Sequence, residues 1–532
     1  MKDMLRRAAY SCGILLILYG ILRVVFPART MGMRPRLLLA SYVLVFVSIW
    51  VHEQKAGGRI SPAYLRSLVL GGYGKPGRIA WLDYVRVLAA MLVIVVHMVP
   101  ALVNGLPAGN PVRGLAIQTE NVGLVCNQLF VMVSGALLLG TEKETDSLFS
   151  FYRKRFLRVL IPCVLYFLLY YGYIYGASFL VPANWRLLSQ CFITLQDGTT
   201  PHFWLMHAII TFYLAAPLYV YAVRRMSGEM LDTLALVILA LHTLFTYSYL
   251  FGVKFQFISF LAQWDSVFLL GYYLTTERAL RHYKKFLAGG ILALMIMLAV
   301  RRTREDYLFL IYNNATLMVL WASAIFLFFR KHADDWFSGE GKLLFFLGKI
   351  SFSVLLVHWL VLYRIVGDIL GISAMSFGII GGIPATFFLT FAISAGIALV
   401  FDNTVVLCAV TVCEKVFSAL ENAAAHLFSR GEGARRGASV SEAGALAAEG
   451  ASCPETDGAP QSASAADAGV APQLPCVLLL ASSFLLLGMV TGKARTAGEI
   501  GAVLLIMSAG AVLFSGAEEL SFKKVYLSGF LW

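Results

Sequence analysis

Apolar residues are grouped along this chain in blocks of about 17–25 residues, the length of helix that crosses a bilayer core of about 30 Å. Short segments between the blocks carry most of the charge. The blocks cover residues 11–26, 37–51, 85–103, 121–140, 156–180, 203–223, 230–250, 258–275, 286–300, 307–329, 343–366, 377–400, 475–491 and 497–515. The pattern predicts an all-α, polytopic membrane protein with about 14 transmembrane helices.

The amino-acid composition supports this prediction and argues against nucleic acid as a partner. Apolar residues make up 59% of the 532 positions and charged residues 14%, whereas an ordinary globular protein is nearer half and a quarter. The net charge of +13 comes from basic residues between the apolar blocks, where they act as topology signals. We therefore expect membrane lipid, and not nucleic acid, as the surroundings of this chain.

Charge in the connectors also sets an orientation. Lys2, Arg6 and Arg7 place the N-terminus in the cytoplasm, and alternation of the predicted spans places the C-terminus there too. The expected location is the plasma or inner membrane of the cell, as a multi-pass protein. The eight cysteines are scattered, without a CxxC motif or a Cys/His spacing typical of a metal site.

The chain divides into five predicted regions. Residues 12–51 and 476–514 form two similar apolar hairpins, which indicates a duplicated two-helix accessory unit. The regions are an N-terminal two-helix hairpin with its connector (1–77), a ten-helix core (78–403), an amphipathic surface helix (404–429), a disordered linker rich in Ala, Gly, Ser and Pro (430–474), and a C-terminal two-helix hairpin (475–532).

Ionisable residues inside spans are costly and are the best indicators of function. Arg86 and His97 are eleven residues apart in the third block, so they share one helix face and lie about 16 Å apart along its axis. Asp83 is one turn from Arg86 and is placed to hold it. Alternatively, Arg86 extends to the interface with Asp83 as its counter-ion. His97 needs a partner or a polar cavity among Met, Val and Ile.

Arg155 and Arg158 open the fifth block three residues apart, which places two guanidiniums side by side at a helix start. Fork-shaped donors at a helix N-terminus suit phosphate oxygens, and ordinary positive-inside anchoring is the alternative. His202, with Trp204, and His358 lie at the same outer depth as His97. One such histidine is usually structural, but three at one depth favour a functional site. No Hx3H or HExxH pattern is present, so no metal is predicted.

Five elements follow one another in a defined order over residues of about 78–405. The first is Arg86 and His97 in "WLDYVRVLAAMLVIVVHMV", and the second is an F-x-x-x-SG element that ends at Ser134 and Gly135. Arg155, Arg158 and a proline follow, and then come "HFWLMHAIITFYLAAP" and "SFSVLLVH". In this order and spacing they resemble the motifs of the membrane-bound acyltransferase-3 family. The chain departs from that family in its two flanking hairpins and in lacking an appended esterase-like domain.

The resemblance implies a fold of ten core helices and an acyl-CoA-dependent O-acyltransferase. The donor is expected to be acetyl-CoA, bound by Arg86, Arg155 and Arg158. The acceptor is expected to be a hydroxyl of a cell-surface glycan or peptidoglycan. The resemblance makes His97 the general base, or in a variant mechanism the acylated residue, with His358 as its catalytic partner. His202, Trp204, Asp83 and Ser134 are expected to bind substrate, and Ser134 with Gly135 allows close approach of helices.

Two other classes of function fit the residues less well. A transporter or flippase for a surface glycan or lipid-linked precursor would use buried histidines as proton relays. The core lacks the internal repeats typical of transporters, and a basic pair at a helix start suits a phosphate-bearing donor better. A catalytically idle membrane scaffold is the third class, against which Arg86 and His97 argue.

Overall fold

The computed structural model describes residues 2–25, 35–75, 78–140, 148–176, 181–195, 198–248, 252–253, 263–303, 315–336 and 341–422. Every regular element in these residues is helical. The prediction of an all-α chain is therefore confirmed for the described residues. The predicted linker at 430–474 and the C-terminal hairpin at 475–532 lie outside them, as does the end of the predicted surface helix at 404–429.

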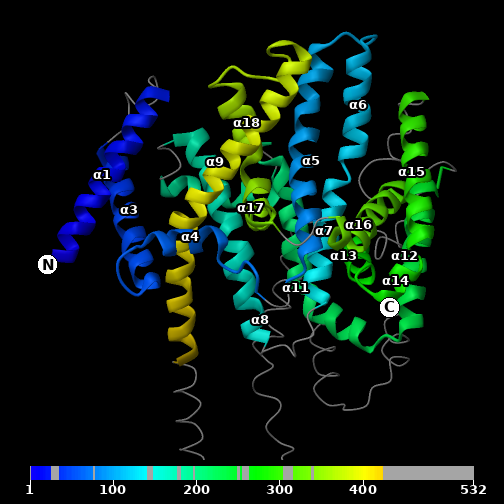
Figure 1. Cartoon of the computed structure of the whole chain (residues 1–532), viewed down its shortest axis with the longest axis horizontal. Helices are drawn as coiled ribbons and strands as arrows, with labels where there is room; N and C mark the ends of the chain where they lie inside the picture. The colour runs from blue at the N-terminus through cyan, green and yellow to red at the C-terminus, as the bar shows by residue number, and fades with distance from the viewer. Residues whose placement is uncertain are drawn as a thin grey trace, which may run out of the picture. The chain divides into compact units, whose positions relative to one another are not determined.

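The described residues of the N-terminal region form three helices. These are α1 (Lys2–Val25), α3 (Pro35–Ala56) and α4 (Pro62–Leu70). Helices α1 and α3 pack against each other, and Glu53 of α3 accepts hydrogen bonds from Arg6 and Arg7 of α1. Ser61 begins α4 by accepting a hydrogen bond from the backbone N–H of Tyr64, as N-cap residues do. In Figure 1, α4 runs across the direction of the long helices.

The longer core helices are α5 (Ala80–Gly105), α6 (Pro111–Gly123), α7 (Cys126–Leu139), α9 (Ile161–Tyr175), α11 (Trp204–Arg225), α12 (Gly228–Tyr247), α15 (Tyr283–Thr303), α16 (Thr316–Trp336), α17 (Lys342–Trp359) and α18 (Gly378–Phe401). The shorter helices are α8 (Leu148–Arg155), α10 (Trp185–Thr194), α13 (Trp264–Tyr273) and α14 (Glu277–Arg281). The 3-10 elements are η3 (Pro182–Asn184) and η4 (Pro201–Phe203). Three π-helical segments are η1 (Phe156–Leu160), η7 (Leu360–Gly367) and η8 (Asp402–Val406).

Nine helical stretches in the described residues are long and apolar enough to cross a membrane. They are Ala80–Gly105, Pro111–Leu139, Leu148–Tyr175, Pro201–Arg225, Gly228–Tyr247, Tyr283–Val300, Thr316–Ala333, Lys342–Gly367 and Gly378–Asn422. Each matches one predicted span, which confirms the polytopic membrane architecture. Helices α1, α3 and α13 overlap the predicted blocks at 11–26, 37–51 and 258–275. They are not among the nine helical stretches. The blocks at 475–491 and 497–515 lie outside the described residues, so the number 14 stays a prediction.

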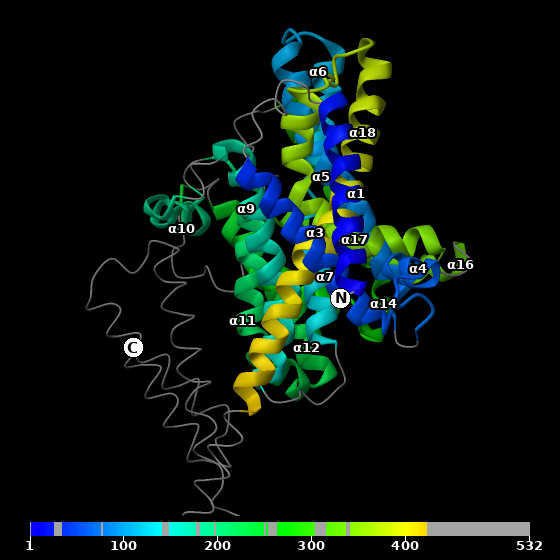
Figure 2. The same cartoon turned by 90° about the vertical axis from the view of Figure 1, so that its left-hand side faces the viewer.

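The core is built around α5, which contacts α6, α7, α16, α17 and α18. A cluster of buried side chains joins α5 to α17 and α18. It includes Ile94 and Met98 from α5, Val354 from α17 and Ala398 from α18. Figures 1 and 2 both show α5 beside α17 and α18. Since α5 carries both Arg86 and His97, this packing fixes the helix that links the two ends of the predicted site.

Two glycines, one on each helix, allow α7 and α13 to approach closely, as is common in membrane bundles. A Cβ atom on Gly135 of α7 would collide with the backbone carbonyl of Phe268 in α13. In the reverse direction, a Cβ atom on Gly271 would collide with the backbone of Met132. The close approach predicted at Ser134 and Gly135 is therefore confirmed, and its partner is α13.

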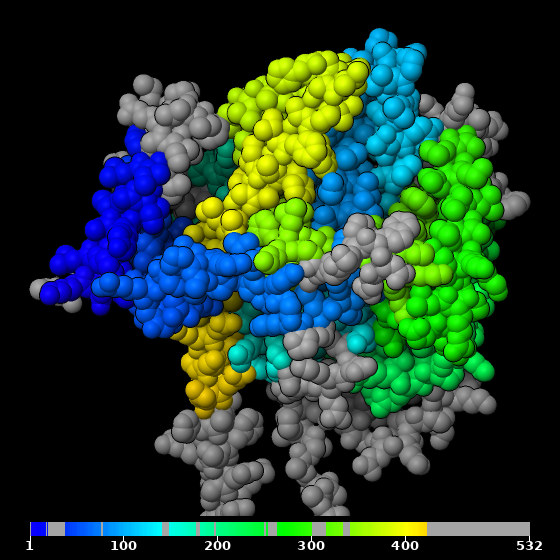
Figure 3. All heavy atoms as spheres, in the orientation of Figure 1, coloured from blue at the N-terminus to red at the C-terminus, as the bar shows by residue number. Residues whose placement is uncertain are grey.

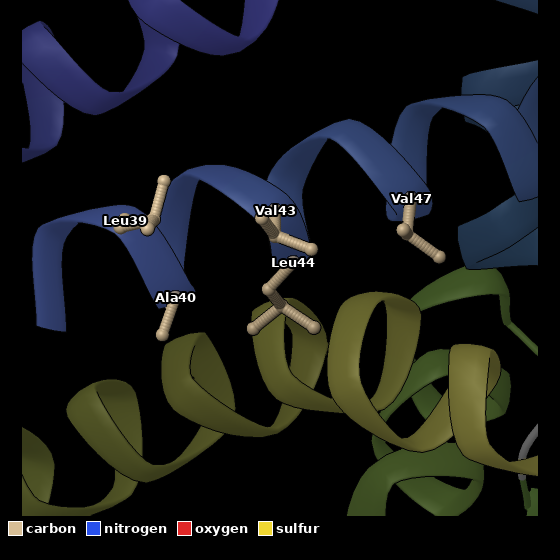
Figure 4. A pocket seen from close by; sticks show the side chains of 5 residues that line it. All are labelled: Leu39, Ala40, Val43, Leu44 and Val47. Atoms are coloured by element: carbon tan, nitrogen blue, oxygen red, sulfur yellow. The ribbon is translucent and has the colours of Figure 1, made fainter. Parts of the chain in front are cut away.

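A crevice of about 530 Å³ runs along α3 and is lined by aliphatic side chains alone. Figure 4 shows them on one side of the helix: Leu39, Ala40, Val43, Leu44 and Val47. In Figure 3 the atoms of α3 and α4 lie directly beside those of α17, which contacts α4. The crevice suits lipid chains and, having no titratable lining group, does not suit chemistry.

By contacts the chain divides into two units, residues 1–144 with 154–412 and residues 145–153 with 413–532. In the described part of the second unit, Arg153 donates a 2.6 Å hydrogen bond to Glu421 and Phe149 packs on Phe417. Helical residues continue from Gly378 to Asn422, which includes most of the predicted surface helix at 404–429. The location of that helix on the membrane surface stays a prediction.

Candidate functional site

Three histidines from three helical elements meet inside the bundle. His97 lies on α5, His202 in η4 and His358 on α17. The rings of His97 and His358 stack with their centroids 5.1 Å apart, and the ring of His202 meets that of His358 edge-on at 5.2 Å. The sequence placed these side chains at one depth, and the structure brings their rings into contact.

Trp359 completes this group, which we call the histidine cluster (His97, His202, His358 and Trp359). Its indole meets the ring of His97 edge-on at 4.8 Å and stacks on the ring of His202 at 5.8 Å. Adjacent residues of a regular helix point in different directions. Here the helix widens into the π-helical η7 directly after Trp359, and such widening is frequent at functional sites.

Hydrogen bonds leave two ring nitrogens of the cluster as unpaired acceptors. The Nδ1 of His358 lies 2.7 Å from the carbonyl oxygen of Leu355, which only accepts, so Nδ1 carries the proton. By the same argument, the Nε2 of His202 donates to the carbonyl of Leu356 at 3.1 Å. The opposite nitrogens are buried and have no hydrogen-bond partner among the described residues. A buried unpaired acceptor costs about 1–3 kcal/mol, so the cluster favours a ligand that donates hydroxyl hydrogens.

Two tyrosines that the sequence analysis missed hold the cluster in place. The hydroxyl of Tyr170 lies 3.2 Å from Nε2 of His202 and accepts a 2.9 Å hydrogen bond from the backbone N–H of Leu360. The hydroxyl of Tyr363 donates to the backbone carbonyl of His97 at 2.7 Å. These bonds tie α9 to η7 and η7 to α5.

The opposite end of α5 carries charge. Nη1 of Arg86 donates a 2.7 Å hydrogen bond to Asp83, the pair that the spacing predicts. Asp83 is 2% exposed, and its second oxygen accepts hydrogen bonds from Arg78, which the sequence analysis did not identify. Gly348 leaves room for this carboxylate, since a Cβ there would lie 2.8 Å from it. Asp83 is thus the counter-ion of two guanidiniums, and the predicted contact of Asp83 with substrate stays a prediction.

Arg155 and Arg158 lie on either side of a change in helix type. Arg155 ends α8 and is half-buried, whereas Arg158 lies within the π-helical η1 and is exposed. The predicted side-by-side placement assumed a regular α-helix, whereas a π-helical turn holds more residues and changes the angle between the two side chains, so that placement stays a prediction. The two guanidiniums still interact electrostatically, and Arg155 also interacts with Tyr213 of α11.

Tyr213 connects the charged residues that the sequence analysis named separately. Its phenol interacts with Arg86 of α5, Arg155 and Ser134 of α7. The hydroxyl of Ser134 also donates to the backbone carbonyl of Phe130 at 2.9 Å. We call Arg86, Arg155, Tyr213 and Ser134 the arginine end. Tyr213 is the tyrosine of the "HFWLMHAIITFYLAAP" string, which was the signal that could have identified it.

Trp204 is the first residue of α11, and its ring packs against Trp264 of α13 with centroids 5.0 Å apart. Although Trp204 is only two residues from His202 in the sequence, its ring contacts α13. Its predicted role in substrate binding stays a prediction.

A half-buried carboxylate lies just beyond the residue at which the last predicted core block ends. Asp402 begins η8 and accepts hydrogen bonds from Tyr166 of α9 at 3.0 Å and from Ser353 of α17 at 2.6 Å. Its carboxylate also interacts with Lys349 of α17. Tyr166 is one turn from Tyr170, and Ser353 is five residues before His358, so Asp402 joins the two helices that support the histidine cluster.

Within the part of the chain that the structure describes, no three His, Cys, Asp or Glu side chains are arranged as ligands of a metal ion. The predicted site residues that the structure groups together thus lie in two sets, the histidine cluster and the arginine end, toward the two ends of α5.

The model of the acyltransferase-3 family, an acyltransferase domain, matches residues 79–399. The chain belongs to the acyltransferase-3 family. Comparison with curated proteins gave no match, and comparison with solved structures gave none. The matched range is most of the predicted ten-helix core.

All nine predicted site residues of this acyltransferase lie within the matched range, from Asp83 to His358. Asp402 lies just after the matched range, and the N-terminal hairpin lies before it. His52 of α3 links that hairpin to the acyltransferase core, because its Nε2 lies 2.7 Å from the backbone carbonyl of Asn403.

Proposed function

We propose that this membrane acyltransferase moves an acyl group, expected to be acetyl, from acyl-CoA to a hydroxyl of a cell-envelope glycan or peptidoglycan. The observation that carries the proposal is the histidine cluster, in which three imidazole rings and an indole meet around two unpaired acceptor nitrogens. Family membership supplies the reaction class. It also favours an enzyme over the transporter that the sequence left as an alternative.

The donor would bind at the arginine end. Arg86 and Arg155 share Tyr213 as a neighbour, and Arg158 is exposed beside them. Guanidinium groups form paired hydrogen bonds to phosphate oxygens, which suits the phosphates of CoA. Asp83 would contribute by holding Arg86 and Arg78 rather than by touching the donor. The acyl-bearing arm of CoA would then extend along α5, over the distance of about 16 Å that eleven residues of helix span.

The transfer would take place at the histidine cluster. A ring nitrogen of His97 accepts the proton of the acceptor hydroxyl, and the hydroxyl oxygen attacks the thioester carbonyl. The C–O bond forms, the C–S bond breaks, and the proton passes from the imidazolium to the departing CoA thiolate. Protons therefore balance without a further acid. His358 and His202 would accept hydrogen bonds from neighbouring acceptor hydroxyls through their unpaired nitrogens.

The proposal also includes an orientation of the chain in the membrane. Basic connectors favour cytoplasmic termini in a plasma or inner membrane, with the arginine end on the cytoplasmic side. CoA thioesters would then be used from the cytoplasm and acceptor hydroxyls from the outer side. Ser134 and Gly135 support this path by allowing α7 and α13 to pack closely.

The test is acyl transfer by the purified protein in lipid vesicles. Acetyl-CoA labelled in the acetyl group is supplied together with solubilised cell-envelope glycans, and label on the glycans and free CoA thiol are both measured. His97→Ala should lower transfer by about 10²–10⁴-fold, the contribution of a general base. Binding of acetyl-CoA should be unchanged, because His97 lies at the far end of α5.

His207→Ala is the matched control. His207 is also a histidine of a core helix with one buried ring nitrogen that has no hydrogen-bond partner among the described residues, but its ring packs on Phe192 and not on the cluster. We expect it to transfer at close to the parent rate. Transfer by His97→Ala at the parent rate would refute the assignment of the base. An equal loss of acyl transfer in both variants would show only that histidines of the core helices are needed for folding.

A further inference from the structure

A cavity of about 290 Å³ lies away from both ends of α5, where α12 and α15 begin. Its polar residues are Asp232, Tyr273, His282 and Lys285, and the rest of its lining is apolar. Helix α14 contacts both α12 and α15 at this point, and Figure 1 shows α14 beside α12. Both α12 and α15 belong to candidate membrane spans, so their first residues lie at a membrane interface.

The acidic residue of the cavity is already neutralised. Asp232 accepts hydrogen bonds from Arg278 at 2.9 and 2.5 Å and from the hydroxyl of Tyr273 at 3.0 Å. Gly228 leaves room for this guanidinium, since a Cβ there would lie 2.8 Å from it. The hydrogen bonds to Asp232 raise the pKa of Arg278, so the pair stays fully ionised and is internally compensated. Asp232 therefore leaves no negative charge for a ligand cation.

The cations of the cavity are not compensated in this way. The side chain of Lys285 is exposed and makes no hydrogen bond or ion pair with any described residue, and His282 lines the cavity beside it. The segment 277–285 contains four Lys or Arg residues and one acid, Glu277. That acid pairs with Arg330 at 2.8 Å. The polar mouth of the cavity thus has a net positive charge and suits an anion.

The other part of the cavity is apolar and reaches the lipid-facing surface. Leu236 of α12 is 67% exposed although it lies inside a candidate span, so it faces lipid. Leu239 and Phe286 continue this apolar wall toward Leu320 of α16. A ligand that fills the whole cavity therefore has an anionic head and an apolar chain.

We propose that this cavity binds one anionic phospholipid, with its phosphate beside Lys285 and His282 and an acyl chain against Leu236 and Leu239. Basic pockets between membrane helices are known to bind acidic lipid headgroups. Inorganic phosphate would satisfy only the polar mouth, and a neutral lipid only the apolar wall. The proposal does not depend on the reaction at the histidine cluster.

Native mass spectrometry of the delipidated full-length protein tests the charge. The protein is titrated with phosphatidylglycerol and, separately, with phosphatidylcholine. Lys285→Gln should weaken binding of phosphatidylglycerol by about five-fold, the contribution of one basic residue near an anionic membrane surface. Lys284→Gln is the matched control, because Lys284 is equally exposed and adjacent but does not line the cavity. Equal weakening by both variants would overturn the site, because surface charge alone then attracts the lipid.

A second pair of variants tests the acyl chain. Leu236→Trp fills the apolar part of the cavity, whereas Val237→Trp places the same side chain on an exposed neighbour that does not line it. Only Leu236→Trp should weaken binding of phosphatidylglycerol. Excess inorganic phosphate should fail to displace the lipid. Full displacement by phosphate, together with normal lipid binding by Leu236→Trp, contradicts the proposal, as does equal affinity of the parent for the two lipids.

Discussion

At one end of α5, Arg86 shares the carboxylate of Asp83 with Arg78, whereas at the other end His97 lies against the rings of His358 and Trp359. The residues of the first group are at most eight positions apart in the sequence. In the second, His97 is more than 250 positions from His358 and Trp359. The ion pairs of Asp83 are therefore organised locally, whereas the histidine cluster depends on the packing of the whole core.

This difference fits the two tasks of the proposed reaction. Phosphate recognition needs strong charges that are held ready, and local ion pairs can supply them. Acyl transfer needs reacting groups placed to within a fraction of an ångström, and only a packed core holds side chains with that accuracy. Changes at the histidine cluster should therefore affect the rate, and changes at the arginine end should affect donor affinity.

The largest expected effect is that of Trp359→Ala. Its indole contacts both His97 and His202, so its loss leaves a cavity inside the cluster. Removal of a packed Trp side chain costs about 3–5 kcal/mol, and we expect the melting temperature and kcat to fall together. Thermal unfolding in detergent and single-turnover acyl transfer measure the two effects.

Trp359→Phe separates packing from chemistry. A phenyl ring retains most of the contact area, so this variant should recover most of the stability and much of the rate. Donor affinity should be unchanged in both variants, because the arginine end lies elsewhere on α5. A large loss of acetyl-CoA binding in Trp359→Ala would show that the two ends are not independent.

The arginine end should respond in the opposite way. Arg155→Ala removes a half-buried guanidinium beside Tyr213, and hydrogen bonds to charged groups contribute about 1.5–3 kcal/mol, or about 10–150-fold in affinity. Arg158 is exposed in η1, so Arg158→Ala should have a smaller effect. Calorimetry with a non-hydrolysable acetyl-CoA analogue gives both values. An equal loss of affinity in the two variants would mean that the π-helical turn does not separate their roles.

These two ends also show what the sequence could predict. The Asp83–Arg86 bond follows from helical spacing alone, and the depth of three histidines follows from the order of the spans. Trp359 and Tyr170 were missed because their contacts depend on which faces of α9, α17 and α5 meet, and one span does not contain that information. Arg155 and Arg158 were placed on a regular helix because a change to π-helical geometry has no clear sequence signal.

Asp402 was missed for a different reason. The last apolar core block was ended at residue 400, so a carboxylate two positions further on was assigned to the connector. In the structure the helix continues to Asn422, and Asp402 lies inside it between Tyr166 and Ser353. Boundaries of predicted elements are their least reliable feature, and here a shift of a few residues concealed a half-buried carboxylate.

Substitutions of Asp402 test whether the two ends of α5 are coupled through the core. Asp402→Ala leaves the hydroxyls of Tyr166 and Ser353 without their acceptor, at a cost of about 1–3 kcal/mol in stability. Since these residues lie on the helices that carry Tyr170 and His358, we expect kcat to fall more than donor affinity. Asp402→Asn retains one acceptor oxygen and should recover part of the rate. If Asn and Ala behave alike in transfer assays, the carboxylate does not position the cluster.

The smallest effect should come from the N-terminal hairpin, which lies outside both ends. Glu53 is 7% exposed, and although burial alone raises its pKa, hydrogen bonds from Arg7 and Arg6 lower it overall. A lowered carboxyl pKa means that this ion pair stabilises the fold fully above the ordinary Glu pKa of about 4.3. The stabilisation is lost as pH falls through the lower value of the folded state.

Glu53→Gln should therefore lower stability at pH 7 by about 1 kcal/mol or less and leave acyl transfer unchanged. The difference in melting temperature between the parent and Glu53→Gln should shrink as the pH is lowered below about 4. Asp3 also pairs with Arg6, so Asp3→Asn is introduced into both proteins to remove this second acidic partner. A difference that is independent of pH in that background would assign the effect to packing of the Glu53 side chain and not to its charge.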